Sequence, residues 1–536
     1  MSFNLLIEKW IPVERTSGVC EWIAPHEITD RFDEDPIREL ACPRPDFNGA
    51  LIQFLVALFQ TAFAPHERRL WRQLLRTPPP STELQSTFLK WKFAFDLDGD
   101  GPRFMQDIQS DLENGVDPVP INRLLISEPG EQSEKLNKDH FIKRSTDAFM
   151  SLPAAAMALI CLQMNAPSGG QGHRTSLRGG GPLTTVVRGE TLWEDVWRNV
   201  VEPDKLDYSP ESLQTSSLLF FPWMAPTKTS ENDEKIEPAE THPLLSFWAC
   251  PRRIRLQFVE SSRQCGVFSS LEVSRGCSGY VTKNYGSKYS ENWIHPLTPY
   301  KKNEDGQSVF SVKTPEGGLS FQHWLGLISH ANGSLPALVI QRLQGENQIE
   351  AVRIRCFGYA MDNMKPLNWV ESEFPLYVFD EPERAQQYAA DLNTLVLAAR
   401  EIWGLLKKSI KQAQPYQSPS ISKKRLGKFE RQFNNSLESK FFSLARELAQ
   451  ISKDGRSEAK RNWLTFLQAT AFMIFDGALL SGDVTGLDHP RVFRGRAYLG
   501  TLLRKARTKV EAILELPLSE GGGSKDKTSK SKEMAV

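Results

Sequence analysis

The spacing of the hydrophobic residues changes near residue 380. After Pro382, apolar residues recur at intervals of three and four, which places each set on one face of an α-helix. Three such stripes, together with the mostly apolar segment Trp463–Leu480, predict four helices of roughly 20 to 30 residues in an antiparallel bundle. The stripes are Leu392, Leu395, Ala399, Ile402, Trp403 and Leu406; Phe429, Phe433, Leu437, Phe441, Leu444, Leu448 and Ile451; and Leu499, Leu502, Leu503, Ala506, Val510 and Ile513.

The pattern before residue 380 is mixed. Phe3–Val13 is rich in strand-forming residues, and a turn at Thr16–Gly18 separates it from Val19–Ile23, so we expect an N-terminal hairpin. Ala50–Phe63 is apolar almost all round and predicts a buried helix, which an exposed helix over His66–Arg76 follows. Short β-like runs then occur among long loops, at Ile254–Phe258, Ala337–Ile340 and Val352–Cys356.

These patterns predict an α+β fold. We expect a large mixed α/β domain over residues 1–380, followed by a C-terminal antiparallel four-helix bundle over residues 381–515. The chain has 536 residues, of which 40% are apolar, so it can bury more than one core. Residues 516–536 are rich in Gly, Ser and Lys and have little to bury, so we expect a disordered tail there.

The composition also bears on the compartment. The N-terminus lacks the pattern of a secretory signal, and the longest apolar stretch, residues 49–64, is shorter than the about 20 residues of a bilayer span. Gln53 and Gln60 interrupt that stretch. The seven cysteines are scattered and contain no C-x-x-C, which is typical of a reducing environment. We therefore expect a cytoplasmic protein with no membrane partner.

The formal charge of the chain is zero, because 65 Lys and Arg balance 65 Asp and Glu. Residues 381–513, however, contain 23 Lys and Arg against 13 Asp and Glu, whereas residues 1–380 contain 38 against 48. The basic bundle favours phosphates as ligands; the alternative is that its cations are merely solvated helix faces. The candidates for non-specific DNA contacts are Lys407, Lys408, Lys423, Lys424, Arg425, Arg504, Lys505 and Arg507.

The segment Ala166–Gly189, here called the glycine-rich block, has an unusual composition. Six glycines fall within thirteen residues, and Arg174, Arg178 and Arg188 are interspersed. Glycine lets the backbone approach a ligand closely, and arginine offers a planar fork to a phosphate or a base edge. The block therefore favours contact with nucleic acid, with a flexible solvent-facing loop as the alternative. Neither a Walker loop nor a strand followed by G-x-G-x-x-G is present.

Other candidate chemistry is weaker. Asp96–Asp107 imitates the start of a calcium-binding loop, but its twelfth position is Asp rather than the bidentate Glu. No catalytic motif is found, which indicates a recognition protein rather than an enzyme. The alternative function is a phosphate- or metal-dependent nucleotide or nucleic-acid enzyme, in which the Gly-Arg loop cradles phosphate and Asp96, Asp98 and Asp100 hold Mg²⁺.

Three features together resemble the CasA family, the large subunits of the type I-E CRISPR surveillance complex Cascade. They are Asn4–Val13, the block ending Ser176–Gly189, and the C-terminal four-helix pattern, and they occur in the same order over nearly the whole chain. The resemblance implies a non-catalytic subunit that recognises the protospacer-adjacent motif (PAM) of double-stranded target DNA and helps open the duplex in antiviral defence. The implied partners are target DNA, the CRISPR RNA-containing Cascade subunits and a recruited helicase-nuclease effector.

The resemblance also implies which residues read the PAM. The groove-facing lysine falls in Gly279–Tyr285, where Lys283 is the candidate and strict spacing leaves Thr282 or Asn284 as alternatives. The glycine loop of the family falls on Ser168, Gly169, Gly170, Gln171 and Gly172.

A wedge that enters the duplex is also implied, and it follows the pair Gly358-Tyr359. Asn363 occupies the position of the usual glutamine, and Asp362 stands where a neutral amide is expected. Phosphates repel an aspartate, so either the register shifts by one residue or the PAM preference differs. The wedge candidates are Asp362, Asn363 and Met364, and a loop for DNA or the backbone subunits is centred on Phe141 with Lys143 and Arg144.

The cysteines depart from the pattern of some relatives, which carry clusters suited to zinc. Here Cys250, Cys265 and Cys277 are isolated in sequence. We therefore expect no metal and no cofactor.

Overall fold

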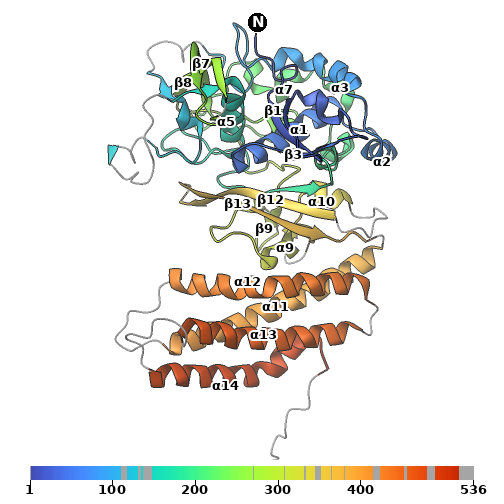
Figure 1. Cartoon of the computed structure of the whole chain (residues 1–536), viewed down its shortest axis with the longest axis vertical. Helices are drawn as coiled ribbons and strands as arrows, with labels where there is room; N and C mark the ends of the chain where they lie inside the picture. The colour runs from blue at the N-terminus through green and yellow to red at the C-terminus, as the bar shows by residue number, and fades with distance from the viewer. Residues whose placement is uncertain are drawn as a thin grey trace, which may run out of the picture. The chain divides into compact units, whose positions relative to one another are not determined.

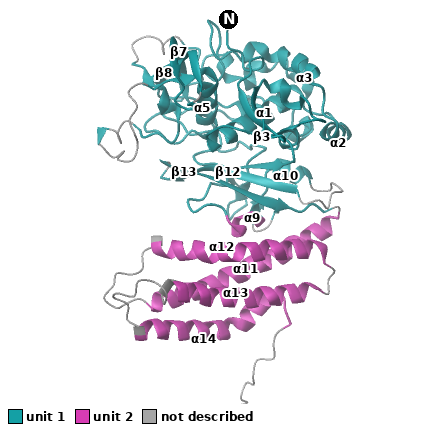
Figure 2. Ribbon diagram, viewed as in Figure 1, with its two compact units in different colours: residues 1–319, 326–380 teal, residues 320–325, 381–536 magenta. Residues whose placement is uncertain are grey.

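The chain forms two compact units (Figure 2). Unit 1 comprises residues 1–319 and 326–380, and unit 2 comprises residues 320–325 and 381–536. The computed structural model describes residues 2–109, 117–130, 135–136, 148–269, 271–306, 308–330, 333–343, 352–363, 365–379, 381–413, 423–451, 455–479 and 489–517.

Unit 1 is built around α1 (Pro45–Ala62), which is buried on nearly all sides as its apolar sequence predicts (Figure 1). It packs against α5 (Leu152–Asn165), α6 (Leu192–Trp197) and α8 (Leu245–Trp248). The exposed helix predicted next is α2 (Arg68–Arg76), in which only Trp71 and Leu75 are buried. Further short helices are α3 (Ser81–Phe88) and α7 (Ser217–Phe220).

An aromatic cluster forms the centre of the unit 1 core. Its rings lie 5.0 to 6.3 Å apart, mostly edge to face, the preferred geometry of aromatic pairs. Each ring is almost completely buried. The cluster contains Phe54, Phe95, Phe104, Trp223 and Trp248.

The strands of unit 1 form small, mostly antiparallel sheets. The predicted N-terminal hairpin is confirmed, although its first strand begins at Ile11 because the side chain of Asn4 caps a preceding turn at Leu6. The strand orders are β2-β1-β3, β13-β12-β6, β10-β9-β11 and β4-β8-β5, with β7 paired to β8. The bounds are β1 Ile11–Arg15, β2 Cys20–Ile23, β3 Ile37–Leu40, β4 Val119–Pro120, β5 Met150–Ser151, β6 Thr184–Arg188, β7 Arg253–Gln264, β8 Glu272–Lys283, β9 Tyr300–Lys302, β10 Val309–Ser311, β11 Ser334–Leu335, β12 Val352–Asp362 and β13 Lys365–Leu376.

The predicted strand at Ala337–Ile340 is wrong, because the segment forms the helix α10 (Leu338–Leu343). A short apolar run fits a buried strand and a buried helix equally well, so periodicity could not separate them. Within the helix, Arg342 forms a buried ion pair with Glu202 at 2.7 Å and lies 3.7 Å from the ring centre of Trp71.

Unit 2 contains the predicted four-helix bundle (Figure 1), formed by α11 (Pro382–Gln412), α12 (Lys423–Gln450), α13 (Arg456–Leu479) and α14 (His489–Ile513). Most residues of the predicted stripes are buried between the helices. Within the described ranges, no helix is both long and apolar enough to cross a bilayer. Residues Phe321 and Trp324 of α9 (Phe321–Ile328) pack on Phe441 of the bundle.

One buried ionic cluster crosses the bundle. The carboxylate of Asp391 on α11 lies 3.0 Å from Arg456 and 2.9 Å from Lys460 on α13. Lys460 also contacts Glu515, beyond the end of α14, at 3.1 Å. Asp391 and Lys460 are both almost fully buried, so removing one partner would leave the other as an uncompensated buried charge.

Candidate nucleic-acid interface

The glycine loop, Ser168–Gly172, leaves the end of α5 and exposes its first four residues. Gly170 has a φ of +104°, and a Cβ atom there would meet nothing within 4 Å. Gly172 also has a positive φ, +75°, and its Cβ position lies 2.8 Å from Asn284 Cβ and 2.9 Å from the Tyr285 amide nitrogen. The loop therefore combines an open tip with a close backbone contact that a larger residue would disturb.

The loop is held at both ends by the base of the β7–β8 ladder. At its start, Arg252 Nη2 donates a hydrogen bond to the carbonyl oxygen of Pro167. At its end, the Tyr285 amide donates to the Gly172 carbonyl at 2.8 Å, and Gln171 Nε2 donates to the Tyr285 hydroxyl at 3.1 Å. Arg252 and Tyr285 flank the paired residues Arg253 and Lys283, so one rigid support positions the exposed tip.

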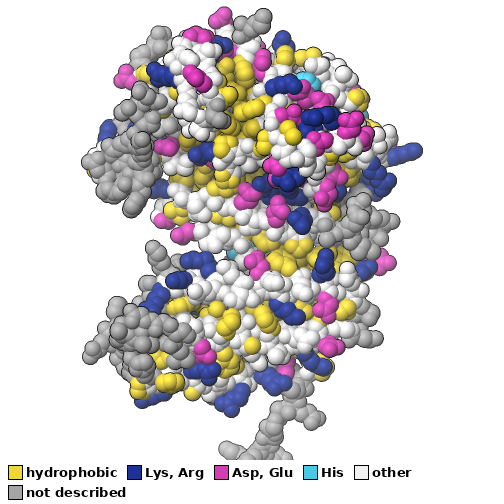
Figure 3. All heavy atoms as spheres, viewed as in Figure 1, with side chains coloured by type: hydrophobic (Ala, Val, Ile, Leu, Met, Phe, Trp, Pro, Cys, Tyr) yellow, Lys and Arg dark blue, Asp and Glu magenta, His cyan; other side chains and the backbone are white. Residues whose placement is uncertain are grey.

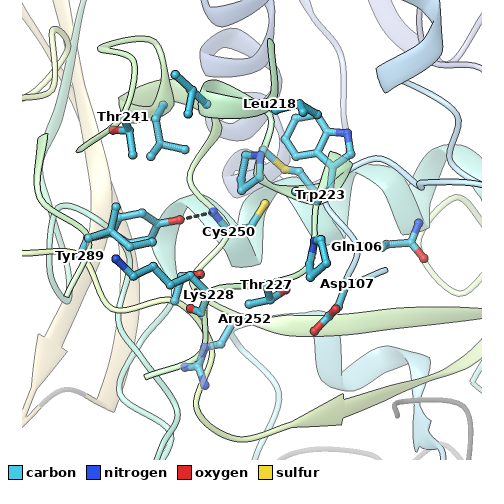
Figure 4. Close-up of a pocket in the computed structure, with 18 of the residues that line it drawn as sticks. Gln106, Asp107, Leu218, Trp223, Thr227, Lys228, Thr241, Cys250, Arg252 and Tyr289 are labelled. Carbon is cyan, nitrogen blue, oxygen red and sulfur yellow. Dashed lines mark hydrogen bonds between the residues drawn. The ribbon is translucent and has the colours of Figure 1, made fainter. Parts of the chain in front are cut away.

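Arg252 is a residue of this region that the sequence did not single out. The backbone of Arg252 exchanges hydrogen bonds of 3.0 Å with the Gln163 side chain, and its side chain points away from Leu218 and Trp223 in Figure 4. Its Nη1 lies 3.1 Å from the Cβ position of Gly169. Burial lowers the pKa of Arg252 to about 10, which still leaves it charged at neutral pH. A positive charge therefore lies directly beneath the glycine loop.

The structure places Lys283 and both of its alternatives beside this loop. Lys283 ends β8 and is partly exposed, whereas the Thr282 hydroxyl donates to the Arg253 carbonyl at 2.7 Å. Asn284 is exposed, packs on Gly172, and hydrogen-bonds to His173. Thr282 already has a backbone partner. The choice of Lys283 as the groove-facing residue stays a prediction.

The predicted wedge residues Asp362 and Asn363 lie at the tip of the β12–β13 hairpin. Both are exposed, and Asn363 Nδ2 donates to Asp362 Oδ1 at 3.1 Å. Asn363 has a φ of +46°, a conformation that asparagine adopts more readily than most residues. The tip therefore presents a carboxylate and an amide outside the sheet.

The hairpin is attached firmly to the core of unit 1. Its strand β12 pairs with β6, the last segment of the glycine-rich block. The Tyr359 hydroxyl donates to Asp46 Oδ2 at 2.5 Å, and Arg44 Nη2 lies 2.8 Å from the same oxygen. Desolvation raises the pKa of Tyr359, so the hydroxyl keeps its proton and this hydrogen bond at neutral pH. The glycine-rich block thus begins with the predicted glycine loop, beside Lys283, and ends in β6, which pairs with the hairpin that carries the predicted wedge.

The three arginines of the block all have partners within unit 1. Arg174 donates to the side chain and carbonyl of Ser230 at 2.7 and 2.9 Å, and Arg188 forms an ion pair with Asp195 at 3.0 Å. Arg178 is only 6% exposed. Its guanidinium donates to Gln53, Thr184, Thr298 and the Met164 carbonyl. The arginines therefore stabilise the block, and the exposed part is its glycine backbone.

Two of the three aspartates of the alternative enzyme hypothesis have structural partners, whereas Asp100 is exposed. Asp96 accepts hydrogen bonds from Ser2 and Asn4, and Asp98 forms a 2.6 Å ion pair with Arg275. In the described part of the chain, no group of three or more His, Cys, Asp or Glu side chains could hold a metal ion. The alternative therefore gains no support from this arrangement.

Comparison with known proteins identifies the family. The model of the CRISPR-associated protein Cse1 family (CRISPR_cse1) matches residues 4–474.

This chain belongs to that family.

Solved structures with a related fold include Thermobifida fusca Cse1 (16% identity, TM-score 0.71, covering 96% of this chain and 98% of that one) and Thermus thermophilus CasA (18% identity, TM-score 0.69, covering 94% and 99%). A third, described as a CRISPR RNA-guided surveillance complex, has 15% identity and a TM-score of 0.64 and covers 95% of this chain and 99% of its own. The predicted fold class, a mixed α/β domain followed by a helical bundle, is confirmed.

The basic candidates of this Cse1-family bundle lie mainly on its outer faces. Lys and Arg side chains are spread along its helices in Figure 3. Lys408, Arg425, Arg504 and Lys505 are exposed, and Lys407 is half-buried. Arg507 is also exposed, and it forms an ion pair with Glu511 at 2.9 Å.

Some predicted site residues lie outside the described residues. These are Phe141, Lys143, Arg144 and Met364, and also residues 518–536 of the predicted tail. The side chains of Lys423 and Lys424 are likewise not described, although both residues belong to α12.

Proposed function

We propose that this chain is the large, non-catalytic subunit of a CRISPR RNA-guided surveillance complex, and that it recognises the PAM of double-stranded target DNA. In this proposal the glycine loop and Lys283 read the PAM, and the β12–β13 tip enters the duplex. The bundle holds DNA without sequence preference. The assembled complex then recruits a helicase-nuclease that degrades the target.

The glycine loop is the observation that carries the proposal. Its tip is exposed and carries no large side chain, yet Arg252 and Tyr285 hold the two ends in place. A backbone presented in this way approaches a groove closely and loses little conformational entropy on binding. A loop that served only as a flexible connection would not need contacts from a half-buried arginine and a tyrosine at its two ends.

The physical chemistry of the minor groove fits this loop. Minor-groove edges distinguish A·T from G·C pairs but carry little further information, so backbone groups with one lysine give relaxed recognition. Inserting the hairpin tip between base pairs costs a few kcal/mol of unstacking. Basic contacts and pairing with the guide RNA offset that cost. The Tyr359–Asp46 hydrogen bond helps the hairpin resist displacement during insertion.

A double variant tests the proposal. Gly170→Asp adds a negative charge at an exposed position with positive φ, and Lys283→Ala removes the predicted groove contact. In a reconstituted surveillance complex we expect the affinity ratio between PAM-containing and PAM-scrambled duplexes to fall by about tenfold or more. Gel-shift titrations with both duplexes measure that ratio.

Gly18→Asp is the matched control, because Gly18 is also exposed, has a φ of +84° and has no atom within 4 Å of its Cβ position. It should leave the ratio unchanged. An unchanged ratio in the Gly170→Asp, Lys283→Ala variant would remove the loop and lysine from PAM recognition.

Assembly requires its own test. Affinity purification of the full chain from its native cells should recover a CRISPR RNA together with several smaller subunits. Recovery of the chain alone, under conditions that preserve other ribonucleoproteins, would contradict its place in such a complex.

A further inference from the structure

A second feature lies behind the glycine loop, where a cavity of about 420 Å³ opens. One wall consists of residues of the glycine-rich block, including Gly170, Gly172 and Gly179. The rest of the lining comes from residues 288–291, from Trp293, from β10 and from Lys313, which follows that strand. Hydroxyl-bearing and basic side chains form much of the lining, which suits a polar ligand rather than an apolar one.

Lys313 is the group of interest in this cavity. Its ammonium donates to the Arg178 carbonyl at 2.8 Å and to Ser311 Oγ at 2.7 Å. Two of its three protons are therefore committed to neutral acceptors, which fixes the direction of the third. Much of the Lys313 side chain is exposed, but the surrounding protein and the nearby charge of Arg178 lower its pKa to about 8.

The charges around this ammonium do not cancel. Neither Lys313 nor the buried Arg178 forms an ion pair with a carboxylate of the described residues, since both bond only to neutral oxygens. Lys288 and Arg174, which also line the cavity, share the single carboxylate of Asp233, at 2.5 and 3.8 Å, so these three groups keep a net positive charge. Glu291, which also lines the cavity, is paired with Lys235 at 3.0 Å.

Two neighbouring positive charges without an acidic partner are costly in a partly desolvated site. An anion in the cavity would remove that cost and would accept the remaining proton of Lys313. The site is open to solvent and adjoins the glycine loop, so an anion carried by a ligand of that loop would reach it.

We propose that this cavity binds a phosphate group through Lys313, and that the phosphate belongs to the backbone of the DNA that the glycine loop reads. The source of the phosphate rests on the proposed function, whereas the phosphate site itself does not. The loop would then recognise the groove while Lys313 holds the strand beside it.

The test uses Lys313→Gln, which keeps a donor for the Arg178 carbonyl but removes the charge, together with the rescue variant Lys313→Arg. In the full surveillance complex, Lys313→Gln should lower the affinity for PAM-containing and for PAM-scrambled duplexes equally, by about fivefold. The slope of log affinity against log salt should flatten by about 0.9, the value for one phosphate contact. Lys313→Arg should restore both quantities.

Lys205→Met is the matched control, because Lys205 lies outside the cavity and pairs with Asp204 at 3.3 Å. It should change neither quantity. If PAM discrimination were absent already in the unmodified complex, the proposed function would fail while the salt slope still tested the phosphate site.

Inorganic phosphate separates the two possible sources. Thermal unfolding of the full chain in phosphate and in chloride, at equal ionic strength, should show stabilisation by phosphate that Lys313→Gln abolishes. If phosphate stabilises the unmodified chain but not Lys313→Gln, while the salt slope of DNA binding is unchanged by the variant, the site binds free phosphate instead. No stabilisation of the unmodified chain by phosphate, with no change in DNA slope for Lys313→Gln, would overturn the site; if that variant does not fold, the phosphate titration alone decides.

Discussion

The glycine-rich block and the four-helix bundle both attract notice through their basic residues, but they use them in opposite ways. In the block, Arg174, Arg178 and Arg188 all bond to partners within unit 1. In the bundle, Lys408 and Lys505 stand exposed on helices whose apolar faces already form the core. The same residue types therefore stabilise the fold in one region and remain available to solvent in the other.

This difference shows that a count of cations does not measure available charge. The block belongs to a domain with more acidic than basic residues, yet it contains a buried arginine bound entirely by neutral oxygens. Substitutions in the block should therefore act on stability and on the shape of the loop. Substitutions of the exposed cations of the bundle should act mainly on long-range attraction of nucleic acid.

The largest expected effect comes from Arg178→Met. The substitution leaves Gln53 Oε1 and the Met164 carbonyl without their guanidinium donor inside the core, so we expect a loss of about 3 kcal/mol in the free energy of unfolding. Urea denaturation followed by tryptophan fluorescence measures it. Arg504→Met makes the same replacement at an exposed site and should cost less than about 0.5 kcal/mol. Equal costs at the two sites would contradict the comparison.

The bundle contains one buried ionic cluster of its own, and Asp391→Asn probes it. The variant leaves Lys460 buried with only the exposed Glu515 as a charged partner, so we expect a loss of about 2 kcal/mol. Asp476→Asn is the control, since its ion pair with Arg496 is partly exposed and should contribute less than about 1 kcal/mol. Differential scanning calorimetry compares the two. A smaller loss for Asp391→Asn than for Asp476→Asn would show that the cluster does not stabilise the bundle.

A buried histidine of unit 1 makes a smaller, pH-dependent contribution to the free energy of unfolding. Burial lowers the pKa of His242 from 6.5 to about 4, and its Nδ1 accepts a hydrogen bond from the Leu244 amide. The unfolded chain binds a proton below about pH 6.5 while the folded chain does not, so stability falls as the pH decreases from 6.5 toward 4. We expect a loss of about 1 to 2 kcal/mol between about pH 7.5 and about pH 5.

His242→Asn should remove this part of the pH dependence, because the asparagine oxygen still accepts the Leu244 hydrogen bond but does not titrate. The exposed His66, changed to Asn, serves as the control and should leave the pH profile as it is. Chemical denaturation at both pH values gives the difference, and a parallel decline in His242→Asn and unmodified protein would remove His242 as its source.

The bundle could be predicted almost completely from the sequence because its information is local. Residues three and four apart decide which face of a helix is buried, and Phe433, Leu437 and Phe441 follow this rule within one helix. Family resemblance extended the prediction to the glycine loop and the hairpin tip. The structure brings Gly172 against Asn284 and Tyr285, more than a hundred residues away in sequence, and the role of these residues in PAM recognition stays a prediction.

The parts that could not be predicted depend on distant residues. Gln53 interrupts an apolar helix and serves there as a hydrogen-bond acceptor for Arg178, 125 residues away. Arg252 and Lys313 take their positions from contacts with Pro167 and with the Arg178 carbonyl, which no spacing rule connects. The predicted strand at Ala337–Ile340 was wrong for a different reason, since four apolar residues contain too little periodicity to distinguish a strand from a helix.

The smallest expected effect on stability, and the sharpest test of the comparison, comes from exposed cations of α14. Lys505 forms no ion pair with a carboxylate of the described residues, whereas Lys509, one turn further along the same helix, lies 2.8 Å from Glu401. Each change to Gln should alter the unfolding free energy by less than about 0.5 kcal/mol. In the assembled complex, Lys505→Gln should lower the affinity for PAM-containing and for PAM-scrambled DNA equally. It should also flatten the slope of log affinity against log salt by about 0.9, while Lys509→Gln should change that slope less. If neither variant moves the slope, Lys505 makes no DNA contact and is only part of a solvated helix face.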